Sequence, residues 1–268
     1  MVSDIILGQY FPGASFIHRL DPRSKILMII AYIAAIFIIN NLFGYIVLGA
    51  FLLISIMNTK IPAKFMLRGL KPVMFFIVLT GAFNLFLTTT GKVYWHWSFL
   101  TVTDEGINNA VFMILRLFFL IMGTSLLTLT TSPIMLTDGI ERLLSPFGKI
   151  GIPHHEIAMM MSIALRFIPT LLEETDKIIK AQTARGADFE SGNILRRVKA
   201  MVPILIPLFI SAFRRADELA TAMECRCYKG GKGRTRLKVL KMGAIDLFGW
   251  IFIVVLFAGI IACNIFIV

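Results

Sequence analysis

The chain has 268 residues, of which 57% are hydrophobic and only 16% charged, and its mean hydropathy is +0.81. Soluble globular proteins carry about 25% charged residues, so this composition excludes an ordinary soluble domain and predicts a membrane protein. The formal net charge of +11 would suit nucleic acid binding, but in a membrane protein it is more typical of basic loops held on the cytoplasmic side.

In chain order, the first elements are apolar segments. The N-terminal stretch contains Asp4, Pro12 and Gly13 and no obvious cleavage site, so we expect no removable signal peptide. The five candidate transmembrane segments are residues 26–39, 42–57, 73–88, 107–130 and 245–268. The first two are short against the roughly 20 residues that a spanning helix needs. They must therefore borrow flanking residues or be sheltered by neighbouring helices.

Basic residues alternate between the connections of these segments. The N-terminal arm and residues 60–71 are rich in Lys and Arg, whereas Asn40-Asn41 is uncharged and the third connection holds only Lys92. By the positive-inside rule, this predicts a cytoplasmic N-terminus and a C-terminus outside the cell membrane. The aromatic loop that contains Tyr94, Trp95 and Trp97 is then expected at the outer interface.

Residues 131–241 hold 18 of the 27 basic residues and include two interrupted apolar patches. Residues 157–172 contain Arg166 and Pro169, and residues 200–213 contain Pro203 and Pro207. Each patch is either a poor transmembrane helix or a helix at the inner face of the membrane. The second interpretation is favoured, because a spanning hairpin would carry Arg185 to the outer side.

The predicted fold is therefore an all-α integral membrane protein with about five transmembrane helices and two long amphipathic helices on the cytoplasmic side. In the first of these, apolar residues from Leu165 to Ile179 recur at spacings of three and four, and a similar pattern runs from Phe209 to Met223. The predicted division is a membrane region at 1–130, a cytoplasmic-side region at 131–241 and a last transmembrane helix at 242–268.

Each amphipathic helix ends near an arginine with small neighbours. Ala184-Arg185-Gly186 contains the expected glycine stop of the first helix, and Cys225-Arg226-Cys227 precedes that of the second at Gly230-Gly231. A structural interpretation is that each arginine only caps a helix, where the dipole favours a cation by about 0.3–1 kcal/mol. A functional interpretation is that two unobstructed guanidinium groups enter grooves of partner proteins and pair bidentately with carboxylates.

The cytoplasmic-side region resembles that of the transmembrane T component of energy-coupling factor (ECF) transporters, which are ATP-driven importers of vitamins and metal ions. Family members carry two Ala-Arg-Gly-type signatures at the ends of two coupling helices. Ala184-Arg185-Gly186 matches the first in full, and Cys225-Arg226-Cys227 matches the second in its central arginine. The similarity extends to the layout of the N-terminal membrane part, including Leu20-Asp21-Pro22-Arg23-Ser24-Lys25.

The resemblance implies a non-catalytic coupling subunit in a prokaryotic cell membrane. Two cytoplasmic ABC-type ATPases would bind the two arginine signatures, and a separate substrate-binding membrane subunit (S component) would be gripped by the helices' apolar faces. The residues expected at this second contact are Met201, Pro203, Pro207, Phe209 and Phe213. The chain itself would bind neither nucleotide nor substrate, so no cofactor is expected, and the identity of the substrate lies in another chain.

Other candidate sites are weaker. The sequence lacks a Gly-x-x-x-x-Gly-Lys-Ser/Thr phosphate loop, and His154-His155-Glu156 lacks the spacing of a zinc site. Cys225 and Cys227 have no second cysteine pair to complete four zinc ligands. The basic stretch 229–241 is expected to face anionic lipid rather than nucleic acid.

Two features leave alternatives open. Arg116 lies inside the fourth segment, where it either marks an internal polar contact or reaches toward the end of the span. The run Met159-Met160-Met161 is expected to pack in the core or against lipid, although it would also suit an adaptable partner surface. The rival to the coupling subunit is a self-sufficient secondary transporter or channel, which would need several ionisable groups deep in its spans.

Overall fold

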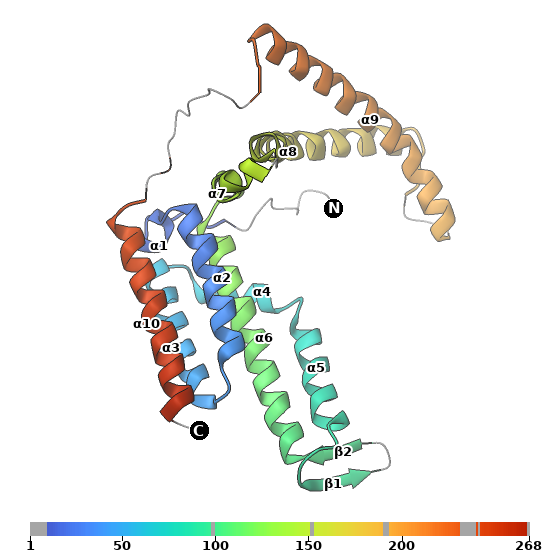
Figure 1. The fold of residues 1–268 in the computed structure, drawn as a ribbon. Helices are drawn as coiled ribbons and strands as arrows, with labels where there is room; N and C mark the ends of the chain where they lie inside the picture. The colour runs from blue at the N-terminus through green and yellow to red at the C-terminus, as the bar shows by residue number, and fades with distance from the viewer. Residues whose placement is uncertain are drawn as a thin grey trace. The chain divides into compact units, whose positions relative to one another are not determined.

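We describe the protein from a computed structural model, which places residues 10–97, 100–150, 153–189, 193–230, 240 and 242–266 (Figure 1). Within these residues the fold is all-α apart from one short hairpin, which confirms the predicted fold class. The elements in chain order are α1 (Phe16–Arg19), α2 (Pro22–Ile38), α3 (Leu42–Thr59), α4 (Ala63–Leu70), α5 (Met74–Leu87), β1 (Val93–Trp97), β2 (Leu100–Thr103), α6 (Asp104–Thr130), α7 (Pro133–Leu144), the 3-10 helix η1 (Ser145–Ile150), α8 (His154–Ala184), α9 (Ile194–Cys225) and α10 (Ala244–Phe266).

The described residues fall into two compact units. One, here called the membrane unit, comprises those of 8–139 and 239–268; the other, called the α8–α9 unit, comprises those of 140–238. The first and last predicted regions of the chain thus pack together in one unit. The placement of the intervening region at the cytoplasmic face stays a prediction.

Four described helices are long and apolar enough to cross a membrane, namely α3, α6, α8 and α10. Helices α4 and α5 meet at a bend of 54° and together could make a fifth span. Helix α2 matches the first predicted segment but has only 17 residues, as the sequence led us to expect of a short span. Helix α8 qualifies by length and composition alone, and its second half carries the charges of Glu173, Glu174 and Lys177.

The core of the membrane unit lies between α2, α3, α6 and α10. Ile36, Leu48 and Ile260 are fully buried there, one from each of the helices α2, α3 and α10. Helix α6 approaches α2 closely at Gly123, where a Cβ atom would overlap Cε1 of the Tyr32 ring. The Tyr32 hydroxyl donates a hydrogen bond to the carbonyl of Phe119 at 2.9 Å, so the ring is held across this contact.

The aromatic connection between α5 and α6 is an antiparallel hairpin of β1 and β2, which the sequence analysis treated as a loop. Thr103 ends the hairpin and caps α6, because its hydroxyl accepts a hydrogen bond from the Gly106 amide at 3.1 Å. Tyr94 is 68% exposed. The side chains of Trp95 and Trp97 lie outside the described part of the molecule, so their predicted contact with the outer interface stays a prediction.

Replacing Gly123 by alanine should destabilise the membrane unit. The new methyl group would overlap the hydrogen-bonded Tyr32 ring, and overpacking of this kind costs about 1–3 kcal/mol. We expect the thermal midpoint of the detergent-purified protein to fall by about 2–12 °C. The matched control is Gly49→Ala, whose Cβ would meet its nearest atom, Cζ of Phe119, at an ordinary 3.4 Å. Equal midpoints for the two variants would contradict the close contact.

Candidate functional site

The C-terminus of α8 is closed by two backbone hydrogen bonds around Arg185. The amide of Gly186 donates to the carbonyl of Thr183 at 2.9 Å, and the amide of Ala187 donates to that of Gln182 at 3.0 Å. This pair of bonds is a Schellman motif, which requires a left-handed residue after the C-cap. Gly186 fills that position with φ of +87°, so the predicted glycine stop is confirmed. Arg185 is the C-cap residue itself.

The C-terminus of α9 is closed in the same way around Arg226. The amide of Cys227 donates to the carbonyl of Glu224 at 2.8 Å, and the amide of Tyr228 donates to that of Met223 at 3.1 Å. The left-handed residue is Cys227, with φ of +53°. The predicted stop at Gly230-Gly231 is therefore wrong. The Schellman bonds close the helix before it reaches Gly230, and Gly231 lies outside the described residues.

The two tripeptides thus have identical structural roles. Their first residues, Ala184 and Cys225, end the helices, their arginines are the C-caps, and their third residues are left-handed. All six residues are exposed. Within the described part of the chain neither guanidinium has a hydrogen bond or an ion pair, so both are available to an external acceptor. The carbonyls at each helix end are satisfied by backbone amides, so capping does not require the arginine side chains.

Helices α8 and α9 are joined by two polar contacts that the sequence analysis missed. Arg215 of α9 forms an ion pair with Glu174 of α8. The side-chain amide of Gln182 donates a hydrogen bond to the carbonyl of Pro203 at 3.4 Å. That carbonyl has no helical donor, because the residue four positions later is Pro207, which lacks an N–H. The side chain of Gln182 therefore replaces the hydrogen bond that Pro207 removes from α9.

These contacts place the two arginines at opposite ends of the helix pair. Positions 174 and 182 of α8 meet positions 215 and 203 of α9, so the two helices run in opposite directions where they touch. Figure 1 shows α9 crossing α8 with the two C-termini directed apart. Arg185 lies three residues after Gln182, whereas Arg226 lies 23 residues after Pro203, which is about 35 Å along a helix. One groove on one small partner could not hold both.

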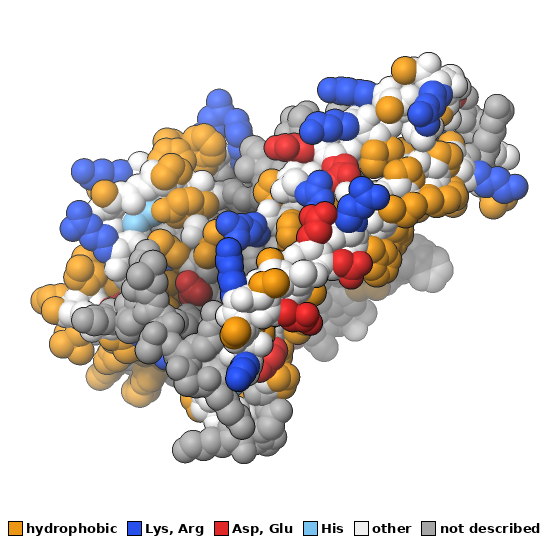
Figure 2. Space-filling model, turned by 90° about the horizontal axis from the view of Figure 1, so that it is seen from above, with side chains coloured by type: hydrophobic (Ala, Val, Ile, Leu, Met, Phe, Trp, Pro, Cys, Tyr) orange, Lys and Arg blue, Asp and Glu red, His pale blue; other side chains and the backbone are white. Residues whose placement is uncertain are grey.

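Helix α9 carries an exposed apolar stripe that includes most of the residues predicted to contact a membrane subunit. Phe209 and Phe213 are 60% and 67% exposed, Met201 and Pro203 are also exposed, and Pro207 is half-buried. Seen from above in Figure 2, hydrophobic side chains gather beside the charged ones over this unit. Further exposed apolar residues continue the stripe at helical spacing, namely Leu195, Val198, Val202, Leu205, Ile206 and Ile210.

The segment Leu20–Lys25, which the resemblance singled out without a role, ties α2 to α10. Asp21 caps α2, and Arg23 binds its carboxylate through two side-chain nitrogens at 3.1 and 3.0 Å. Burial raises the pKa of Asp21, but the hydrogen bonds from Arg23 outweigh burial and hold the pKa below its usual value. Asp246 of α10 accepts hydrogen bonds from the amides of Asp21 and Gly243 at 2.8 and 2.9 Å.

Lys25 ties the same segment to the end of α6. Its ammonium group donates to the carbonyls of His18 and Thr130 and to the hydroxyl of Thr131 at 3.0–3.3 Å. Three acceptors satisfy the three donors of a buried lysine, whose desolvation would otherwise be costly. This network closes one end of the membrane unit.

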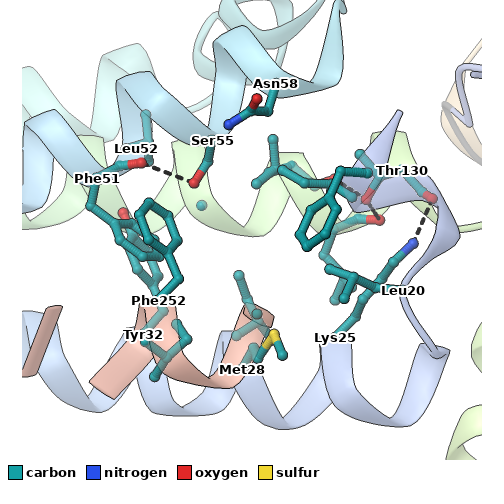
Figure 3. A pocket seen from close by; sticks show the side chains of 18 of the residues that line it. Leu20, Lys25, Met28, Tyr32, Phe51, Leu52, Ser55, Asn58, Thr130 and Phe252 are labelled. Atoms are coloured by element: carbon teal, nitrogen blue, oxygen red, sulfur yellow. Dashed lines mark hydrogen bonds between the residues drawn. The ribbon is translucent and has the colours of Figure 1, made fainter. Parts of the chain in front are cut away.

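Beside Lys25 lies a mainly apolar cavity of about 270 Å³ that the sequence did not predict (Figure 3). Most of its polar side chains are already paired within the chain: Lys25 as above, Ser55 to the carbonyl of Phe51 at 2.9 Å, and Tyr32 to that of Phe119. The exposed amide of Asn58 also lines the cavity and has no hydrogen bond within the described residues. Figure 3 shows Met28, Leu52 and Phe252 among the apolar groups around it. The cavity is not built to recognise a polar solute.

The remaining candidates are placed as follows. His154 begins α8, and Nδ1 of His155 lies 3.2 Å from Oε1 of Glu141 in the same unit. Among the described residues, no cluster of three or more His, Cys, Asp and Glu side chains is arranged to hold a metal ion. Cys225 and Cys227 are free thiols. Arg116 lies over the ring of Phe37, 5.4 Å from its centroid. The basic stretch 229–241 is outside the described residues except for residues 229, 230 and 240.

Comparison with known proteins gives consistent matches over most of the chain. The family described as cobalt transport protein (CbiQ) matches residues 13–237. Proteins named energy-coupling factor transporter transmembrane protein EcfT are 58% identical in Ruminiclostridium cellulolyticum, over 92% of both chains, and 58% identical in Clostridium kluyveri, over 98% of this chain and 96% of that one. The protein of that name in Bacillus subtilis is 49% identical over 90% of this chain and 91% of its own.

Substitutions at the two left-handed residues, Gly186 and Cys227, should have opposite effects on the stability of the two helix ends. A side chain in that conformation costs roughly 1–2 kcal/mol, so Gly186→Ala should weaken the end of α8 while Cys227→Gly should strengthen the end of α9. Hydrogen exchange of the Ala187 and Tyr228 amides should change about tenfold, faster in the first variant and slower in the second. Ala187→Ser, outside the left-handed position, is the control. A change in the same direction at both sites would contradict the shared cap.

Proposed function

The chain belongs to the CbiQ family of energy-coupling factor transporter transmembrane proteins, and on this premise we propose that it is the coupling subunit of an ATP-driven importer of vitamins or other micronutrients. Two cytoplasmic ABC-type ATPases bind its two arginine signatures, and an S component carries the substrate. ATP-driven closure and reopening of the ATPases moves α8 and α9 relative to each other. The chain performs no chemistry itself.

The observation that carries this proposal is the pair of identical caps at diverging helix ends. In each cap the Schellman bonds hold the backbone of the arginine, and its exposed guanidinium has no partner among the described residues. A guanidinium forms bidentate hydrogen bonds with a carboxylate, which gives the contact direction as well as affinity. Arg185 lies near the contact of α8 with Pro203, and Arg226 lies about 35 Å further along α9, so the two groups suit two ATPases.

The apolar stripe of α9 supports the contact with an S component. Phe209 and Phe213 lie on the same helix as Arg226 and after both of its prolines, so motion imposed at its C-terminus is transmitted to them along uninterrupted helix, whereas Met201 lies before Pro203. Charged residues flank the central part of α9, at Arg197 and Lys199 before it and from Arg214 after it, and no charged residue lies between Met201 and Phe213. This uncharged central part suits contact with a membrane subunit.

The distribution of basic residues supports an orientation with the N-terminus in the cytoplasm and the C-terminus outside. Both arginine signatures are then on the ATPase side of the membrane. ATP itself is handled by the partners, since the sequence contains no phosphate-binding loop. Nucleic acid has no part in this function.

The rival, a self-sufficient secondary transporter or channel, has little support. In the cavity of the membrane unit the lysine, serine and tyrosine donors are bonded to carbonyls or hydroxyls of the chain, which leaves one lining amide, that of Asn58, without a bond among the described residues. A transport site needs polar groups that a solute can reach. The family description names cobalt, whereas the proposed function covers vitamins and other micronutrients. Both substrates fit a transporter in which a separate subunit binds the substrate.

The first test is purification of the chain from its native membrane, which should recover two ATPases and one small hydrophobic subunit. Arg185→Ala and Arg226→Ala should each reduce ATPase recovery and transport, because loss of one partner from a buried charge pair costs about 2–5 kcal/mol. The double variant should abolish both while membrane insertion is unchanged. Lysine at either position keeps the charge but loses the bidentate geometry, so its effect should be intermediate.

Arg214→Ala is the matched control, since Arg214 is also exposed on α9 but lies outside the cap. Normal transport by the double variant would mean that the two arginines have no coupling role. Recovery of a lone chain that transports substrate would favour the rival function.

The apolar stripe is tested separately with Phe213→Asp. A carboxylate in place of an exposed ring should weaken a hydrophobic interface without disturbing the fold. We expect the S component to be lost from the purified complex and both ATPases to remain. Thr221→Asp, at an exposed polar position on the same helix, should keep all partners. Loss of the ATPases with retention of the S component in Phe213→Asp would reverse the assigned roles of the stripe.

A further inference from the structure

Arg116 is a charged residue of α6 whose counter-ion is absent from the described part of the chain. Its guanidinium lies 5.4 Å from the centroid of the Phe37 ring. Its Nε atom is inaccessible and has no hydrogen-bond partner, and no described carboxylate forms an ion pair with it. Because an unpaired charge in a spanning helix is costly, such residues usually face an acceptor. The acceptor of Arg116 must come from outside the described chain.

Contacts between helices show which parts of α2 and α3 lie beside Arg116. Phe37 belongs to the last turn of α2, and Tyr45 in the first turn of α3 stacks near Phe112, with ring centroids 5.8 Å apart. Phe112 lies one helical turn from Arg116. Although Arg116 is near the middle of the 27-residue α6, it therefore lies close to the α2–α3 connection. Figure 1 shows α6 and its hairpin extending past that connection.

Amide groups mark the same end of α2, α3 and α10 as a polar boundary. Nδ2 of Asn264 donates to the carbonyl of Ile38 at 2.8 Å, and Nδ2 of Asn41 lies 3.5 Å from the carbonyl of Cys263. Asn40 is exposed beside them. Such groups belong at the edge of the hydrocarbon layer rather than at its centre. Arg116 is about one turn of helix from this edge.

The length of α2 brings lipid headgroups toward Arg116. Its 17 residues are about 25 Å long, which is shorter than the roughly 30 Å hydrocarbon core. A short span is accommodated by local thinning of the bilayer. The neighbouring side chains of Phe37, Leu42 and Phe43 are 58%, 53% and 54% exposed, as expected of residues in contact with lipid.

Side-chain direction completes the argument. Helical side chains lean toward the N-terminus of their helix, and the N-terminus of α6 is at the hairpin end. Arg116 therefore leans toward the leaflet on the hairpin side, as long basic side chains do near a membrane surface. We propose that Arg116 binds the phosphate group of a phospholipid in that leaflet, with the Phe37 ring beneath the guanidinium. This site is independent of the partners assigned above.

The site is tested by native mass spectrometry of the intact complex, released from nanodiscs that contain phosphatidylglycerol. Wild type and Arg116→Lys should retain one more phosphatidylglycerol than Arg116→Gln, with affinity about tenfold higher, since charge-assisted hydrogen bonds are lost in the glutamine variant. A galactosyl diacylglycerol, which has no phosphate, should not replace the retained lipid in wild type. Arg214→Gln removes the same charge elsewhere and should retain the lipid.

Four results would overturn the proposal. The first is equal phospholipid retention by wild type and Arg116→Gln. The second is equal loss in Arg116→Gln and Arg214→Gln, which would reflect net charge alone. The third is loss of a membrane subunit from Arg116→Gln with no change in retained lipid, which would identify a partner carboxylate as the counter-ion. Equal retention of the galactolipid by wild type would also exclude a phosphate site.

Discussion

The buried polar network around Leu20–Lys25 is the constraint on which the membrane unit depends. Helices α2 and α10 are more than 200 residues apart in sequence, yet a carboxylate oxygen of Asp246 in α10 accepts a hydrogen bond from the amide of Asp21 at the start of α2. Lys25 joins the same point to the end of α6. Apolar packing alone is weakly directional in lipid, because lipid tails are as apolar as the side chains. Satisfied charges at one end therefore fix the register of α2, α6 and α10.

The sequence predicted the helices well because long apolar segments have few other possible structures in a membrane. It predicted the end of α8 from Gly186, but placed the end of α9 too late. Glycine is the usual left-handed residue, and nothing in the pattern indicated that Cys227 would adopt this conformation instead. The hairpin of β1 and β2 was missed since its aromatic residues also suit an interfacial loop. The contacts of Asp246 and Gln182 depend on tertiary packing and have no local signal.

The two arginine signatures differ in sequence but have the same backbone geometry. In sequence, Ala184-Arg185-Gly186 is closer to the Ala-Arg-Gly signature than Cys225-Arg226-Cys227 is. The backbone hydrogen bonds nevertheless give corresponding positions of the two tripeptides the same role. In this chain the third positions of the two signatures thus share a backbone conformation rather than a residue type. Cysteine adopts it at a cost in strain, and it also places a free thiol next to Arg226.

The contact between Gln182 and Pro203 restricts how the α8–α9 unit can deform. Because Pro207 has no N–H, the carbonyl of Pro203 lacks its helical hydrogen bond, and α9 could bend at this point. The side chain of Gln182, three residues before Arg185, binds this carbonyl instead. The ion pair between Arg215 and Glu174 holds α9 to α8 at a second point, 12 residues further along α9, so pivoting about either contact would break the other. The residues of α9 from Arg215 to Arg226 extend beyond both contacts. This last part of α9 can therefore move with a partner bound at Arg226 while both contacts to α8 remain.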